Sequence, residues 1–225
     1  GYPGVIIRID TPLTTPLFVD TTVTCTAGTA LSVLARESVN MRLMGFETLG
    51  GIPGTVGGAV AMNAGAYGAE IRHIIKSVRI LKNGRVLDVE TKKTDFGNRT
   101  SKFAAPEVVV LSATFQLAPD DGGAKERMLE TTRQRKEKQP LSLPSAGSVF
   151  KRPNGRFAGA LIEGAGLKGF SVGGAQVSPM HAGFIVNNGK ATERDVLELI
   201  SIIQQRVFDE TGVQLEREVK LLSEL

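Results

Sequence analysis

The sequence predicts an α+β fold, with a mainly antiparallel sheet in the first half of the chain and a smaller α+β domain after it. Short runs rich in β-branched residues dominate the first half, and Asn83-Gly84 stands between two of them as a hairpin signal. A turn cluster, Pro-Asp-Asp-Gly-Gly at 119–123, favours a domain boundary there. We therefore expect domains over residues 1–122 and 123–213, followed by a tail over residues 214–225.

Five segments of the first half have the pattern of strands. They are Val5–Ile9, Val23–Ala27, Val78–Leu81, Val86–Val89 and Val108–Phe115. Leu31, Leu34 and Ala35 follow Thr29 with helical spacing, which predicts a short helix. Several strands with few long helices between them indicate antiparallel pairing.

The second half has three segments with helical patterns. Lys125–Lys138 is a charged helix with Met128, Leu129 and Thr132 expected on one side, and Pro140 and Pro144 end it. Arg156–Leu167 predicts a short helix. Thr192–Phe208 is the clearest helix, because Thr192 can cap it with Asp195 three residues on, and Gly212 is placed to end it. Its apolar stripe consists of Val196, Leu199, Ile200, Ile203 and Val207.

The composition is that of an ordinary globular protein. Among 225 residues, 41% are hydrophobic and 22% charged, which excludes a disordered tail, a collagen or a coiled coil. No apolar run approaches the ~20 residues that span a bilayer. The net charge of +4 is compatible with anionic small molecules or with nucleic acid. Without a signal segment at its start, the sequence predicts a cytoplasmic protein.

Cysteine and histidine are scarce. The single cysteine, Cys25, excludes an internal disulfide, and its threonine-rich strand predicts a small buried side chain. His73 and His181 lie far apart and lack the spacing of metal ligands, so we expect no metal site.

Glycine is concentrated between residues 50 and 68, where seven of 19 residues are glycine. Such a loop lets backbone N–H groups approach an anion without Cβ atoms in the way. The segment has neither the Walker A spacing nor the Rossmann fingerprint. On glycine content alone, nucleotide or phosphate binding and a tight packing loop are equally supported.

Four other segments could carry chemistry, and each has a plainer structural interpretation. Ser148 precedes two cations, but a lone serine in a turn is usually structural. Arg99 lies between aromatic residues and could hold an anion or form a surface ion pair. The alternating segment 215–222 is typical of an edge strand. The basic run at 133–138 lacks aromatic residues to stack bases, so it indicates a solvated helix face.

Taken in order, these segments resemble one family closely. The motifs are Gly-Ile-Pro-Gly-Thr-Val-Gly-Gly at 51–58, Asn-Ala-Gly-Ala-Tyr-Gly at 63–68, Arg-Thr-Ser-Lys-Phe at 99–103, Gln-Pro at 139–140, Pro-Ser-Ala-Gly-Ser-Val-Phe-Lys at 144–151, Gly-Gly-Ala-Gln-Val-Ser at 173–178 and Leu-Glu-Arg-Glu-Val at 215–219. Together they resemble the UDP-N-acetylenolpyruvoylglucosamine reductases, in particular the shorter type II branch. The resemblance runs from about residue 4 to residue 222.

The resemblance implies an NADPH-oxidising flavoenzyme of peptidoglycan precursor synthesis. Its cofactor would be FAD, and its substrate the enolpyruvyl ether of UDP-N-acetylglucosamine. By match to the family motifs, Arg99 would hold the substrate carboxylate, Ser148 would donate a proton to the carbanion, and Glu218 would assist. The resemblance further implies an FAD-binding domain in the first half, a UDP-sugar domain in the second, a tail that returns to the first flavin subdomain, and a monomer that binds neither nucleic acid nor membrane.

Binding residues follow from the same resemblance. Those implied for FAD are Gly51, Ile52, Pro53, Gly54, Thr55, Val56, Gly57, Gly58, Asn63, Gly65 and Val110. Those implied for the substrate are Tyr67, Lys138, Lys151, Arg152 and Gln176. Lys151, three residues after Ser148, is also a candidate neighbour that assists its proton transfer.

The sequence departs from the family pattern in places. Asn98 stands where a tyrosine is usual, and Arg217 where a proline is usual. The family also has an N-terminal domain that ends in a Gly-x-Gly-Ser-Asn phosphate loop, and this sequence begins just after that point, so we expect the chain alone to bind FAD weakly. Two alternatives stay open: a nucleotide-binding module without catalysis, and a nucleic-acid-binding protein. The low aromatic content, 5%, argues against the second.

Overall fold

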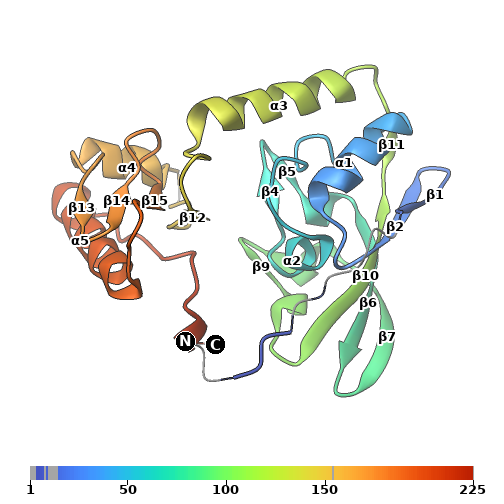
Figure 1. Cartoon of the computed structure of the whole chain (residues 1–225). Coiled ribbons are helices and arrows are strands. Elements are labelled where there is room, and N and C mark those ends of the chain that lie inside the picture. The colour runs from blue at the N-terminus through green and yellow to red at the C-terminus, as the bar shows by residue number, and fades with distance from the viewer. Residues whose placement is uncertain (1–3, 8, 10–14, 154, 225) are drawn as a thin grey trace. The chain divides into compact units, whose positions relative to one another are not determined.

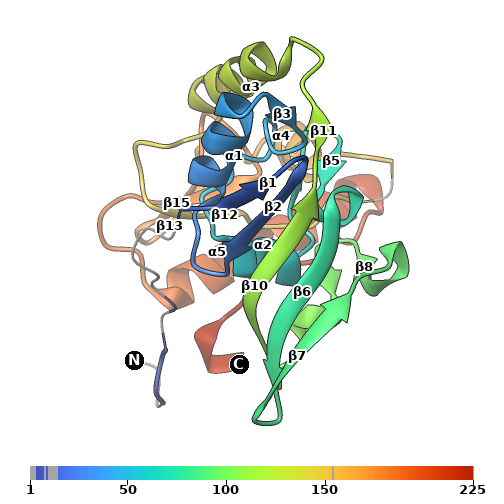
Figure 2. The same cartoon turned by 90° about the vertical axis from the view of Figure 1, so that its right-hand side faces the viewer.

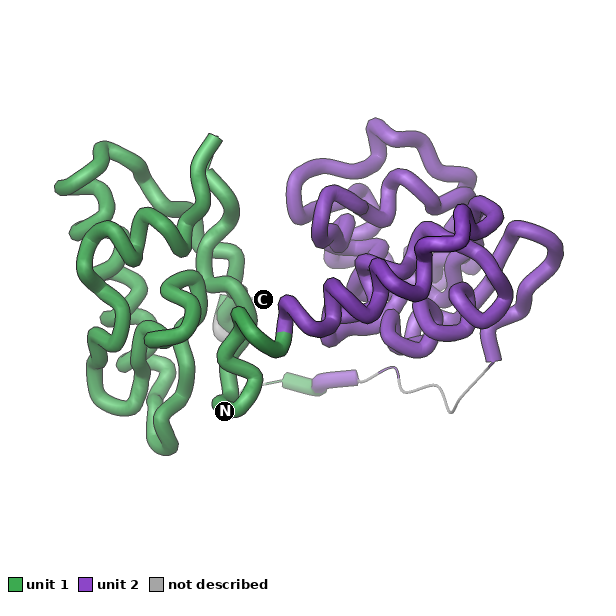
Figure 3. Tube along the Cα trace, turned by 90° about the horizontal axis from the view of Figure 1, so that it is seen from above, with its two compact units in different colours: residues 1–5, 136–225 green, residues 6–135 purple. Residues whose placement is uncertain are grey.

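The structure is a computed structural model that describes residues 4–7, 9, 15–153 and 155–224. The chain divides into two compact units (Figure 3). Residues 6–135 form what we call the N-terminal unit, and residues 136–225 together with 1–5 form the C-terminal unit. The division falls near the end of a helix rather than at the turn cluster 119–123, and the domain bounds expected from the sequence stay a prediction.

The N-terminal unit consists mainly of strands that follow one another in pairs, with helices between the pairs (Figure 1). Its strands are β1 (Leu17–Val19), β2 (Thr22–Thr26), β3 (Leu43–Met44), β4 (Gly65–Ala66), β5 (Ala69–Glu70), β6 (Ile75–Lys82), β7 (Arg85–Glu90), β8 (Phe96–Gly97), β9 (Thr100–Ser101), β10 (Val108–Gln116) and β11 (Ala118–Pro119). Its α-helices are α1 (Leu31–Asn40), α2 (Val56–Ala61) and most of α3 (Ala124–Lys138), and its 3-10 helices are Ile71–His73, Lys93–Asp95 and Lys102–Ala104.

A five-stranded antiparallel sheet organises this unit, in the order β1-β2-β10-β6-β7 (Figure 2). The predicted hairpin is confirmed: Asn83 and Gly84 both have positive φ, 49° and 73°, and join β6 to β7. A bulge between Val110 and Ser112 in β10 shifts the register, so that Val110, Ala113 and Phe115 are all buried.

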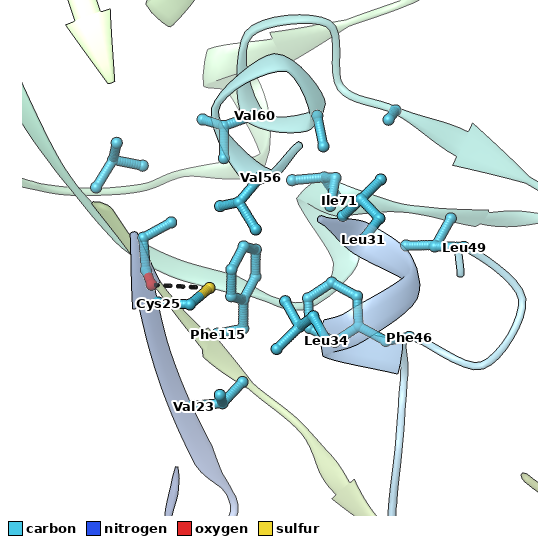
Figure 4. Close-up of a cluster of buried hydrophobic side chains, with 14 of the residues drawn as sticks. Val23, Cys25, Leu31, Leu34, Phe46, Leu49, Val56, Val60, Ile71 and Phe115 are labelled. Atoms are coloured by element: carbon cyan, nitrogen blue, oxygen red, sulfur yellow. Dashed lines mark hydrogen bonds between the residues drawn. The ribbon is translucent and has the colours of Figure 1, made fainter. Parts of the chain in front are cut away.

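The core of the N-terminal unit forms where α1 and α2 pack on this sheet (Figure 4). Four side chains at this place have no exposed surface: Leu31 and Leu34 of α1, Val56 of α2 and Phe115 of the sheet. Phe115 packs edge-on against Phe46, with ring centroids 4.9 Å apart. Cys25 is buried, as predicted, and burial raises the pKa of its thiol to about 12.

Helix α3 matches the predicted bounds within a residue, but its buried face differs from the prediction. Leu129 is 57% exposed and Thr132 is exposed, so the expectation that they share the packed side with Met128 is wrong. The packed stripe contains Ala124, Met128, Thr131 and Arg135, at positions i, i+4, i+7 and i+11. Ala124 and Thr131 are buried, and the other two are partly buried, like Arg127 and Gln134 beside them. Two of the four are polar, which hides the stripe from a hydrophobicity pattern.

The C-terminal unit is a four-stranded antiparallel sheet with two helices. Its strands are β12 (Ser145–Ser148), β13 (Ser171–Val172), β14 (Ala175–Val177) and β15 (Phe184–Asn187), in the order β12-β15-β14-β13. Its helices are α4 (Ala158–Gly164) and α5 (Glu193–Thr211), followed by a 3-10 turn over Leu222–Glu224. The stripe of α5 packs on the sheet as predicted, with Leu199 and Ile203 fully buried.

Both ends of α5 have the predicted caps. The Thr192 side chain accepts a hydrogen bond from Asp195 N, and the Asp195 carboxylate accepts from Thr192 N. Gly212 ends the helix with φ 68°, the left-handed conformation that favours glycine. At the other end of the chain, residues 4–7 and 9 are in no helix or strand, so the strand expected over Val5–Ile9 is absent from them; Arg8 lies outside the described residues.

Candidate active site

The glycine-rich loop of the N-terminal unit is fixed to the start of α1. Leu31 N donates to Gly54 O at 3.0 Å, Val56 N to Thr29 O at 2.9 Å, and Gly57 N to Ala27 O at 2.8 Å. Pro53, Gly54 and Thr55 are exposed between these anchors. The loop therefore has a rigid base and an accessible backbone that leads into α2.

The loop glycines divide into two kinds. A Cβ at Gly50 would lie 2.5 Å from Ala35 Cβ, and one at Gly57 would lie 3.0 Å from Ala27 Cβ, so packing within the unit accounts for these glycines. A Cβ at Gly54 would meet no atom within 4 Å, and one at Gly58 only Thr55 Oγ1, at 3.9 Å. The backbone at these two positions is open to close approach by a ligand, so the loop fits a phosphate-bearing cofactor.

The remaining residues implied for FAD have varied surroundings. Val56 and Val110 are buried in the core and Ile52 packs partly against it, so these side chains shape the base of the loop. Pro53 and Thr55 are exposed. Gly51 lies against the side chain of Arg135, since a Cβ there would be 2.7 Å from Arg135 Cδ.

The side chain of Asn63 forms hydrogen bonds within the protein and has a structural role. It is 2% exposed and has φ 44°. Its Nδ2 donates to Glu70 Oε2 and to Gly97 O, both at 2.9 Å, and its Oδ1 accepts from Arg72 N at 3.1 Å. Any contact of Asn63 with a cofactor is left to its backbone.

Arg99 and Tyr67 lie near the second part of the glycine-rich segment. Arg99 is partly buried, has φ 54° in the turn between β8 and β9, and donates from Nη1 to Gly65 O at 3.1 Å. Tyr67 is 49% exposed, and its hydroxyl donates to Thr131 O at 3.3 Å. The side chain of Ser101, just after the arginine, donates to Val60 O and Ala61 O at 2.9 Å, which ties the Arg99 turn to α2.

Ser148 ends strand β12 of the C-terminal unit. It pairs with Phe184 of β15 and is exposed, while Val149 and Phe150 directly after it are buried in the core. The serine is thus the last exposed residue before two residues that are buried in the core of the C-terminal unit.

The chain tail pairs with that segment. Phe150 bridges Arg217, Glu218 N donates to Val149 O at 2.8 Å, and Lys151 N donates to Glu216 O at 2.8 Å. Glu218 therefore has its backbone bonded to the residue after Ser148, although the two are 70 positions apart. The structure brings these two predicted residues together within one unit. The tail's predicted return to a first flavin subdomain is not tested by this contact.

In the C-terminal unit, three of the residues implied for the substrate each have a different partner within the protein. Lys151 forms an ion pair with Glu216, so its ammonium group is directed to the tail. Arg152 lies over the ring of Phe157, 3.9 Å from the centroid. Gln176 donates to Gly169 O at 3.0 Å, and Lys138 is exposed at the end of α3. Their contacts with a substrate stay predictions.

Three contributions to the site were missed in the sequence. Ser101 belongs to the motif at 99–103, but nothing in the sequence indicates that its side chain anchors the Arg99 turn to α2. Glu216 is 70% exposed, as an edge strand predicts, but no sequence pattern indicates its ion pair with Lys151. Arg135 was included in a solvated basic run, but it is partly buried against Gly51. Helical spacing from Thr131 is the one signal that could have found Arg135.

No group of three or more His, Cys, Asp or Glu residues is arranged to hold a metal ion in the part of the chain that the structure describes. No helix in that part is long and apolar enough to cross a membrane.

The fold and the loop define a class, and comparison with known proteins gives the family. The N-terminal unit has a glycine-rich loop open to a ligand, and residues 1–90 match the family described as "FAD binding domain", which defines the class as a flavin-dependent protein. Residues 139–222 match "UDP-N-acetylenolpyruvoylglucosamine reductase, C-terminal domain". The chain belongs to the UDP-N-acetylenolpyruvoylglucosamine reductase family.

Individual relatives support this membership over the whole chain. The UDP-N-acetylenolpyruvoylglucosamine reductases of Caldanaerobacter subterraneus and Clostridioides difficile are each 44% identical over 226 aligned positions, covering 100% of this chain and 74% of the relative. That of Alkaliphilus oremlandii is 47% identical over 229 positions with the same coverage. The crystal structure of the Thermus caldophilus reductase matches 91% of this chain and 74% of its own, with 38% identity and a TM-score of 0.77.

Proposed function

We propose that this protein catalyses the NADPH-dependent reduction of UDP-N-acetylglucosamine enolpyruvate to UDP-N-acetylmuramate in peptidoglycan precursor synthesis, with FAD as its cofactor. The observation that carries the proposal is sequence identity of 44–47% over the whole chain with reductases of this name. The open glycine-rich loop and the pairing of the tail beside Ser148 are the structural features that support it.

The reaction determines what the protein must provide. FAD, when bound, carries hydride from NADPH to the substrate. Addition of hydride to the methylene carbon of the enolpyruvyl ether leaves negative charge on the neighbouring carbon, beside a carboxylate. The protein must hold that carboxylate, stabilise the developing charge and supply one proton.

We assign the electrostatic role to Arg99. Its guanidinium can hold a carboxylate through two parallel hydrogen bonds. Ser101 fixes the turn that carries Arg99, and the bond from Arg99 to Gly65 O orients the guanidinium, so little of its position has to be adjusted during the reaction.

We assign the proton transfer to Ser148, with Glu218 assisting. A serine hydroxyl needs neighbours to act as an acid near neutral pH, because it holds its proton tightly. The backbone bond from Glu218 N to Val149 O keeps the glutamate next to the serine strand. The family match gives these two residues their roles, and the tail pairing supports them.

NADPH as reductant, a monomeric state and a cytoplasmic location complete the proposal, and each follows from the family resemblance alone. The assembly state can be measured by sedimentation equilibrium, which we expect to give the mass of one chain.

The test is an assay of the full-length purified protein. We expect NADPH oxidation to depend on UDP-N-acetylglucosamine enolpyruvate, and mass spectrometry to find a product that has gained two hydrogen atoms. Oxidation of NADPH that does not depend on that substrate, or a substrate of unchanged mass, would overturn the proposal.

A further inference from the structure

Arg135 lies directly on the glycine-rich loop. A Cβ at Gly51 would be 2.7 Å from Arg135 Cδ, 3.4 Å from Nη1 and 3.5 Å from Nε. The stem and the guanidinium therefore rest against the loop backbone, and a side chain at position 51 would have to push the Arg135 side chain aside. The contact joins α3 to the loop within the N-terminal unit.

Unlike Arg127 and Arg133, the other two arginines of α3, Arg135 has no acidic partner among the residues that the structure describes. Arg127 pairs with Glu47 and Asp121, and Arg133 pairs with Glu130. Arg135 has neither an ion pair nor a hydrogen bond with any of the residues that the structure describes. A partly buried guanidinium without an anion is unfavourable, since its five donors lose water without gaining acceptors.

The surroundings hold Arg135 in this place. Thr131, one helical turn earlier, is 8% exposed and accepts through its carbonyl the hydroxyl hydrogen bond of Tyr67. Burial lowers the pKa of the Arg135 guanidinium, and the Tyr67 phenol nearby acts in the opposite direction.

We propose that Arg135 binds a phosphate group of a ligand that lies over the glycine-rich loop. The inference rests on the proposed function for the identity of that ligand. The diphosphate of FAD is favoured, because Gly51 lies in the segment that matches the FAD binding domain and because Gly54 and Gly58 of the same loop are open to a ligand. The diphosphate of the UDP-sugar has the same chemistry and is the alternative source.

The experiment compares three variants of the full-length protein. Arg135→Ala removes the charge, Arg135→Lys keeps a charge without the planar fork, and Arg133→Ala is the matched control, since it removes an exposed, paired arginine from the same helix. The readouts are the Kd of the flavin-free protein for FAD, from flavin fluorescence, and the KM values for UDP-N-acetylglucosamine enolpyruvate and NADPH. Thermal unfolding of each flavin-free variant measures folding separately.

We expect Arg135→Ala to weaken FAD binding roughly 10- to 100-fold, as expected for loss of a charge-assisted hydrogen bond. Arg135→Lys should lie between wild type and Arg135→Ala, and Arg133→Ala should match wild type. An unchanged Kd for FAD with an equally raised KM for the UDP-sugar would also support a phosphate contact and assign it to the substrate. If Arg135→Ala changes neither FAD binding nor either KM, the proposal is overturned, whatever its effect on thermal unfolding.

Gly51→Ala is an independent check, because the new Cβ must displace the Arg135 side chain. We expect it to weaken binding of the same ligand, and to add little when combined with Arg135→Ala. Additive losses would contradict a shared contact. A wild-type protein that binds FAD but does not reduce the enolpyruvyl substrate would end the proposed function while leaving the Arg135 test intact.

Discussion

In the proposed reaction, Ser148 acts as an acid toward the carbanion that hydride addition leaves on the substrate. A serine hydroxyl near neutral pH gives up a proton only to a strong base, and a carbanion beside a carboxylate is such a base. The proposed role therefore needs an exposed serine with Glu218 held nearby, whereas a hydrolase would need a general base to activate its serine.

For Ser148→Ala in the full-length protein, we expect flavin reduction by NADPH to stay close to the wild-type rate. Reoxidation by the enolpyruvyl substrate should slow by roughly 10²–10⁴-fold, the usual contribution of general acid catalysis. Stopped-flow absorbance measures the two half-reactions separately. Equal slowing of both would indicate a folding defect, and unchanged turnover would remove Ser148 from the mechanism.

Cys25 is the only thiol in the chain, and its burial makes a simple test of the N-terminal core. With its pKa raised from 9.0 to about 12, the fraction present as thiolate is roughly 10³-fold lower than in the unfolded chain at pH 8. We expect a thiol reagent to react with the native protein at least ~100-fold more slowly than with protein in denaturant. Rapid reaction of the native protein would show that the core around Cys25, on the sheet that contains β2 and β10, opens readily.

At the scale of elements, the glycine-rich loop combines packing glycines with ligand-facing ones. Gly50 faces α1 and Gly54 faces open space, although they are four residues apart. A count of glycines cannot separate these roles, because it contains no information on which neighbours a Cβ would meet.

The two kinds of glycine should respond differently to the same substitution. Gly50→Ala forces a Cβ to 2.5 Å from Ala35 Cβ, and we expect it to destabilise the protein by about 1–3 kcal/mol. Gly54→Ala should change stability by no more than about 0.5 kcal/mol but weaken FAD binding. Urea unfolding and flavin fluorescence measure the two effects. A loss of stability in Gly54→Ala without a change in FAD affinity would contradict the assignment.

Glu218 is held in position because the tail pairs with residues 149–151. The ion pair between Lys151 and Glu216 adds a side-chain contact to this pairing. For Glu216→Gln, we expect substrate-dependent flavin reoxidation to slow roughly 10-fold through misplacement of Glu218. Stability should fall by no more than about 1 kcal/mol, because the Glu216 side chain is 70% exposed. Glu224→Gln, which breaks the Arg217–Glu224 pair in the same tail, is the control and should keep the wild-type rate. Equal rates in the two variants would contradict a positioning role for Glu216.

For the whole molecule, local signals predicted the elements and long-range contacts escaped prediction. The Asn83-Gly84 hairpin and the caps of α5 were predicted because short sequence patterns determine them. The bulge in β10 and the bridge between Phe150 and Arg217 depend on partners distant in the sequence, which no local pattern specifies. The prediction of the buried side of α3 was wrong for a similar reason, because the polar residues Thr131 and Arg135 lie on that side.

The site was predictable only in part for the same reason. The resemblance to a family identified the segments of Arg99, Ser148 and Glu218, and spacing alone left each with a structural interpretation. The structure adds that Glu218 is bonded next to Ser148 and that Arg99 is tied to α2 through Ser101. Neither contact follows from residue types, because both join segments that are tens of residues apart.

The most direct test of the central claim is an anaerobic titration of the full-length protein, followed through the visible absorption of its flavin. Addition of NADPH should bleach the flavin, and one equivalent of UDP-N-acetylglucosamine enolpyruvate should then restore the oxidised spectrum. A flavin that NADPH reduces and this substrate leaves reduced, or a protein that binds no flavin, would contradict the account.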